Sequence, residues 1–80
     1  MRSDAEDPQA SALRLVKRSI SIRGHRTSVS LEDAFWTRLQ RWATARGLSV
    51  SAIIAEIDEA RGPGNLSSAI RVAVLEFLDQ

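Results

Sequence analysis

Apolar and polar residues alternate with a period of two over residues 18–31, and this alternation predicts two short β-strands. Ile20 and Ile22 share one parity in the first half, and Val29 and Leu31 share one parity in the second. Most of these residues are β-branched, which suits a pleated surface with one buried face. The segment is therefore expected to pair with itself or with a second copy.

A glycine near the middle of this segment predicts a tight hairpin turn. We place Gly24 and His25 at its two central positions, because glycine in the first of them suits a type II′ turn. That register sets Arg23 opposite Arg26 and separates apolar from polar residues without exception. The expected apolar face holds Ile20, Ile22, Thr27, Val29 and Leu31, and the polar face holds Ser19, Ser21, Arg23, Arg26, Ser28 and Ser30.

The period then changes to that of a helix, and residues 32–46 are predicted to form the first long one. Ser30 followed by Asp33 resembles a capping box at its start. Gly47 supplies a left-handed stop at its end. Trp36 and Trp42 follow the apolar stripe, so we interpret them as core or interface residues rather than as platforms for nucleic-acid bases.

Two further helices are predicted at residues 49–61 and 66–79, separated by a Gly-Pro-Gly break. Either of two serines can cap the second helix, and either an asparagine or a serine can cap the third. The third helix is apolar on more than one side, so we expect a second subunit to cover part of it. The candidate caps are Ser49 or Ser51 for the second helix and Asn65 or Ser67 for the third.

The amino-acid composition excludes several classes of function. The 80 residues include no cysteine and one histidine, which excludes a disulfide framework, a cysteine zinc site and a thiol nucleophile. No cofactor or metal is expected, and an enzyme is not expected. The acids Glu56, Asp58 and Glu59 are interpreted as a solvated helix face rather than a metal site. No apolar run suits a signal peptide or a membrane span, so we expect a cytoplasmic protein.

Positive charge is concentrated in one short stretch. The formal net charge is +1, yet residues 17–26 hold four basic residues and no acid. Such a stretch is the electrostatic footprint of an anionic partner, although a solvated basic loop has the same composition. Residues 1–16 are polar and are expected to form a flexible arm with a helical turn near residues 13–16. Residues 17–80 are expected to form one domain.

The order of strand, helix, Gly-containing turn and Ser-capped helix resembles the ribbon-helix-helix family, the fold of the MetJ/Arc-type repressors. The resemblance covers TSVSLEDAFWTRLQRWATARGLSVSAIIAEIDEAR, from Thr27 to Arg61. Over the wider range 18–78 the chain resembles short stand-alone bacterial members. It implies a mainly α protein with a short β-ribbon, built as an intertwined homodimer. The N-terminal hairpin and the last helix are additions to that pattern.

The resemblance also implies a function and its residues. The family's ribbon enters the major groove of double-stranded DNA, and we predict a sequence-specific repressor or autoregulator. The alternative is a protein-interaction module such as an antitoxin, whose partner would cover the last helix. The implied base contacts are Arg26, Ser28 and Ser30, and the expected phosphate contacts are Lys17, Arg18, Arg23, Ser49, Val50 and Ser51.

Overall fold

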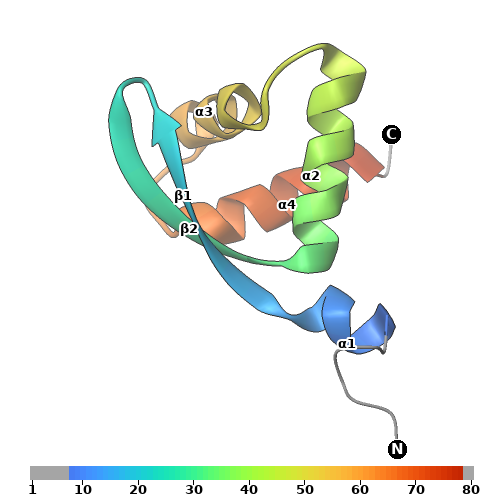
Figure 1. Ribbon diagram of the computed structural model, residues 1–80. Coiled ribbons are helices and arrows are strands. Elements are labelled where there is room, and N and C mark those ends of the chain that lie inside the picture. Colours follow the sequence, from blue (N-terminus) through green and yellow to red (C-terminus); the bar gives the residue numbers. More distant parts are fainter. Residues whose placement is uncertain (1–7, 79–80) are drawn as a thin grey trace, which may run out of the picture.

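A computed structural model describes residues 8–78 of the chain (Figure 1). A two-stranded antiparallel ribbon lies along one side, and three helices pack against its inner face. A short helix precedes the ribbon. The elements are α1 (Pro8–Leu13), β1 (Leu15–Ile22), β2 (His25–Glu32), α2 (Asp33–Arg46), α3 (Val50–Ala60) and α4 (Leu66–Leu78).

The hairpin turn is centred one residue earlier than the sequence predicted. Arg23 and Gly24 are its two central residues, with φ angles of 50° and 83°. Positive φ at both positions is typical of a type I′ turn, whose twist matches that of the flanking strands. The predicted pairing of Arg23 with Arg26 is therefore wrong. Ser21 lies opposite Arg26, and the two arginines do not face one another.

The predicted division of the ribbon into two faces is confirmed. Ile20, Ile22, Val29 and Leu31 are all buried on the inner face. Moving the turn by one residue shifts each residue's partner by two positions, and two positions restore the same face. The pairing changed while the faces did not.

The first strand begins earlier than the alternation indicated. β1 starts at Leu15, and the predicted helical turn near residues 13–16 is wrong because the helix occupies Pro8–Leu13. The Asp33 amide donates to the Arg14 carbonyl at 3.0 Å, which continues the ladder beyond β1. The first seven residues of the predicted arm lie outside the described residues, as do residues 79–80.

Helix α2 begins without a side-chain cap. Its N-cap residue is Glu32, whose side chain makes no capping hydrogen bond. The predicted capping box at Ser30 is wrong, because β2 continues through Ser30 to the helix and places that residue within the strand. The predicted stop is confirmed. Gly47 has a φ of 68°, and its amide donates to the carbonyls of the last turn.

The other two long helices carry the caps that the sequence allowed. Ser49 caps α3, where its hydroxyl accepts from the Ala52 amide at 3.1 Å. Asn65 caps α4, where its side-chain oxygen accepts from the Ser68 amide at 3.1 Å. Each cap satisfies one amide that the helix leaves without a partner.

The core lies between the ribbon and the helices. α3 packs against β1, α4 packs against β2, and α2 packs against both of these helices. The Trp42 ring stacks on Phe77 with centroids 5.2 Å apart, which ties α2 to α4. The buried residues are Ile20, Ile22, Val29, Leu31, Leu39, Ala43, Ile53, Ile54, Ile57, Ile70 and Val74. Among residues 8–78, no helix is long and apolar enough to span a membrane.

Candidate nucleic-acid interface

The outer face of the ribbon carries cations and hydroxyls. Lys17, Arg26 and Ser28 are exposed there, and Ser30 is half-buried. The ladder pairs Ser21 with Arg26, and Lys17 with Ser30. The three residues predicted to contact base edges therefore lie on one surface with one of the predicted phosphate ligands.

The ion pairs of the protein separate its cations into two groups. Six arginines lie within 4.0 Å of a carboxylate, and together they engage five of the six carboxylates between residues 8 and 78. Within the same range, Lys17 and Arg26 form no ion pair. No carboxylate between residues 8 and 78 therefore neutralises the positive charge of the outer ribbon face. The six paired arginines are Arg14, Arg18, Arg23, Arg46, Arg61 and Arg71.

Arg18 lies on the inner face of the ribbon, away from Arg26. Its Nη2 donates to Asp33 at 2.9 Å, and its guanidinium carbon lies 4.4 Å from the centre of the Trp36 ring. Only 23% of its side chain is exposed. The parity of the sequence carried this information, because residue 18 has the same parity as Ile20 and Ile22. Contact with a phosphate would break both interactions.

Arg23 projects from the turn toward the C-terminal half of α3. Its Nη2 donates to the Ala55 carbonyl at 3.0 Å and lies 3.5 Å from a Glu59 carboxylate oxygen. Asp58 stands at 4.0 Å. About half of the side chain remains exposed. The turn arginine is thus held by acids of its own chain.

The start of α3, which the sequence predicted as a phosphate-binding site, lies apart from the hairpin turn. Ser49, Val50 and Ser51 form the start of α3, whereas Arg23 contacts the other half of that helix. Ala55, which accepts from Arg23, lies six residues after Ser49 and therefore about 9 Å along the helix axis, so these two predicted phosphate sites are separate on one chain. The amides after Ser49 remain suitable for a phosphate.

The base of the ribbon is an acid–base cluster. Hydrogen bonds from Arg18, aided by Arg14, hold the pKa of Asp33 below its ordinary value. The Arg71 side chain lowers the pKa of Glu32 through a hydrogen bond of 2.9 Å. Both carboxylates therefore stay ionised at neutral pH and fix β1 and α4 to the start of α2.

The acidic residues of α3 also serve as ion-pair partners. Glu56 lies 2.7 Å from Arg46, and Asp58 lies 2.7 Å from Arg61. Between residues 8 and 78, no group of three potential metal ligands comes together.

Two cations on α2 were missed from the sequence. Arg38 and Arg41 are exposed, and neither forms an ion pair with another residue of the described chain. A sequence signal was present, because residues 34–55 hold three arginines and no acid. Arg38 and Arg41 form a second positive surface, outside the ribbon.

Comparison with known proteins identifies the class. The sequence matches the ribbon-helix-helix domain family over residues 15–78, which includes β1, β2 and the three long helices. The chain belongs to this family, whose domains generally bind DNA and form dimers.

A solved structure shares the fold. The chain is similar to an uncharacterized protein from Bordetella pertussis Tohama I, with 26% sequence identity and a TM-score of 0.74. The match covers 94% of this chain and 63% of the length of that protein. A comparison with curated proteins finds no match.

Proposed function

We propose that the protein is a sequence-specific DNA-binding repressor or autoregulator that acts as a homodimer. The observation that carries the proposal is the division of cations. Lys17 and Arg26 lie on the outer face of the ribbon and form no ion pair among residues 8–78, whereas Arg18 is paired on the inner face. A two-stranded ribbon fits the major groove, where base edges are exposed.

Recognition of the DNA sequence is assigned to the outer face of β2. Arg26 can donate two parallel hydrogen bonds to a guanine, which is the commonest specific contact in this groove. Ser28 and Ser30 can donate or accept, so they discriminate less between bases. Arg26 therefore carries most of the selectivity in this proposal.

Phosphate contacts are assigned to Lys17 and to the start of α3. Lys17 lies on the outer face with Arg26, and the free amides that follow Ser49 suit an anion. Arg18 and Arg23 add to this set only if they leave their carboxylate partners. The structure thus favours a smaller phosphate-binding set than the sequence predicted.

Salt dependence tests the proposal. Fluorescence anisotropy with a labelled duplex from upstream of the protein's own gene would give the affinity between 50 and 300 mM salt. Two phosphate contacts from each of two chains predict release of about four counterions, so log K should fall against log salt with a slope of roughly −4. A slope near zero, or equal affinity for unrelated duplexes at all salt concentrations, would contradict the proposal.

The alternative of an antitoxin-like interaction module depends on the apolar surface of α4. Val72 and Leu75 are both exposed there. A neighbouring gene for a small toxin would favour this alternative. A well-behaved homodimer in the absence of any partner would argue against it.

A further inference from the structure

Helix α2 carries a polar and cationic surface on the side that is turned away from the core. Leu39 and Ala43 are buried against the other elements, whereas the residues on the opposite side of the helix are exposed. Arg38 and Arg41 lie on this exposed side, about one turn apart. The surface, called the α2 face below, comprises Ala34, Thr37, Arg38, Gln40, Arg41 and Thr44.

The two cations of the α2 face are not balanced by a nearby acid. Neither Arg38 nor Arg41 forms an ion pair within residues 8–78, and the sequence holds no acid from residue 34 to residue 55. Side chains three positions apart are neighbours on a helix, so the two guanidinium groups repel one another. An anion bound beside both groups would relieve this repulsion. The charge of the face therefore favours an anionic partner.

Two shallow hollows join on the α2 face. One of about 520 Å³ lies between α1 and α2, and one of about 460 Å³ lies further along α2. Thr37 and Arg41 line both, so the hollowed surface is continuous. Asp33 is the only acid of the described chain that lines it, and this carboxylate accepts from both Arg14 and Arg18. Two arginines share one carboxylate there, so that end of the surface also keeps a positive charge.

The kinds of side chain on the α2 face favour nucleic-acid phosphates over an acidic protein segment. Guanidinium, hydroxyl and amide groups donate hydrogen bonds, and all three are side-chain groups that contact the DNA backbone. Protein interfaces depend instead on a buried apolar or aromatic centre. None of the five large apolar residues that the described chain exposes lies on α2.

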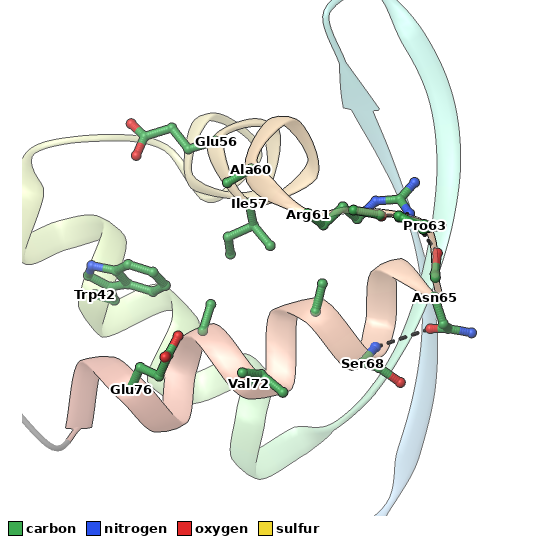
Figure 2. Close-up of a pocket in the computed structure, with 14 residues that line it drawn as sticks. Trp42, Glu56, Ile57, Ala60, Arg61, Pro63, Asn65, Ser68, Val72 and Glu76 are labelled. Atoms are coloured by element: carbon green, nitrogen blue, oxygen red, sulfur yellow. Dashed lines mark hydrogen bonds between the residues drawn. The ribbon is translucent and has the colours of Figure 1, made fainter.

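The exposed apolar surface of the protein is gathered mainly on α4. Val72 is 56% exposed, and it borders a groove of about 580 Å³ between α3 and α4 that Trp42 and Ile57 also line (Figure 2). A second copy or another protein would gain free energy by covering that surface. The α2 face offers no such gain, so we do not place a subunit interface there.

The α2 face and the outer face of the ribbon lie on different sides of the molecule. The helices pack against the inner face of the ribbon, and the core separates that ribbon from the outward side of α2. Figure 1 shows the hairpin at the left of the molecule and α2 at the right. A duplex seated on Lys17 and Arg26 is therefore separated by the core from Arg38 and Arg41.

We propose that the α2 face binds the phosphates of a second stretch of DNA, independently of base sequence, so that the protein bound at its own site also holds another DNA segment. Arg38 and Arg41 supply the charge, and neighbouring hydroxyl and amide groups supply further hydrogen bonds. The choice of DNA as the polyanion rests on the proposed function, whereas the second binding surface goes beyond it. Two segments held in this way would close a loop in the DNA between them.

Capture of one duplex by another tests the proposal. The upstream duplex is fixed to beads and loaded with the full chain, and a labelled unrelated duplex is then added. The wild-type protein should retain the labelled duplex at low salt and release it at high salt, because only phosphates are contacted. The double variant Arg38→Ala/Arg41→Ala should retain at least about 10-fold less, while its affinity for a single upstream duplex falls by less than about threefold.

Two further variants serve as matched controls. Arg38→Lys/Arg41→Lys keeps both charges and should retain most of the labelled duplex. Arg46→Ala removes an arginine of the same helix that is paired with Glu56, and retention should not change. All three arginines are exposed, so circular dichroism should show an unchanged fold in every variant.

A double alanine variant that retains the labelled duplex as well as the wild type overturns the inference. A wild type that binds the bead duplex but retains no second duplex overturns it too, as does an equal loss from Arg46→Ala. These outcomes leave the proposed function intact. A wild type that binds neither duplex overturns the proposed function and the DNA surface on α2 together.

Discussion

Arg18 on β1 donates a hydrogen bond of 2.9 Å to Asp33, the first residue of α2. The contact lies on the inner face of the ribbon, opposite the outer face that carries Arg26. It gives one basic stretch of sequence two different roles. Arg18 holds the ribbon to the helices, while Lys17 and Arg26 form no ion pair within the described chain.

Arg18→Ala should therefore affect stability more than DNA binding. The change removes an ion pair and a cation–π contact with Trp36, and we expect the melting temperature to fall by about 4–8 °C. Arg46→Ala, at a more exposed pair, should shift it by about 2 °C or less. Thermal denaturation measures the change in stability, and fluorescence anisotropy with the labelled duplex measures the change in DNA affinity. A large loss of DNA affinity with unchanged melting would reverse the assignment.

Arg23→Asn tests whether the turn arginine contacts DNA. Asn-Gly is a favoured pair for a type I′ turn, so the hairpin should persist and the free energy of unfolding should change by less than about 1 kcal/mol. DNA affinity should fall by less than about threefold, because the Arg23 side chain is held by α3. A loss comparable to that of Arg26→Ala would place Arg23 in the interface.

Stability should decrease in acid. The pKa of Asp33 and the pKa of Glu32 are lower in the folded protein than in the unfolded chain, so the unfolded chain binds more protons as pH falls. Their contribution is present at neutral pH and is lost as the pH falls through the acidic range in which these carboxylates take up protons. Urea unfolding at several pH values measures it. Asp33→Asn should lose less stability over this range than the wild type, and an equal loss would contradict the assignment.

Ser67→Ala should loosen the edge of β2. The change leaves the half-buried Ser30 amide without its acceptor, and we expect a loss of about 1 kcal/mol together with faster amide exchange at Ser30. Ser68→Ala is the matched control, since the α4 cap at this residue uses the backbone amide rather than the hydroxyl. Equal exchange at Ser30 in both variants would show that α4 does not close this edge.

The sequence predicted which face of the ribbon each residue occupies better than it predicted which residues pair across the two strands. Alternation placed Ile20 and Val29 on the inner face correctly, because a period of two fixes which side a residue occupies. It could not choose between two registers that preserve those faces. The choice depended on Arg23 adopting a positive φ, which a residue with a β-carbon rarely does.

Contacts between segments far apart in the chain also could not be predicted from the sequence. Ser30 has the spacing of a helix cap, but its amide is bound by Ser67, 37 residues later. The partners of Arg18 and Arg23 depend in the same way on how the ribbon lies across the helices. Charge density located the basic stretch, and only the fold showed which of its side chains pair with carboxylates of the described chain.

The comparison of Arg26→Ala with the wild type on the upstream duplex tests the central claim most directly. The account predicts a loss of about 1–3 kcal/mol in binding free energy, reduced preference over unrelated duplexes, and an unchanged melting temperature, because Arg26 is exposed and forms no ion pair within the described chain. Unchanged affinity and unchanged selectivity would contradict it.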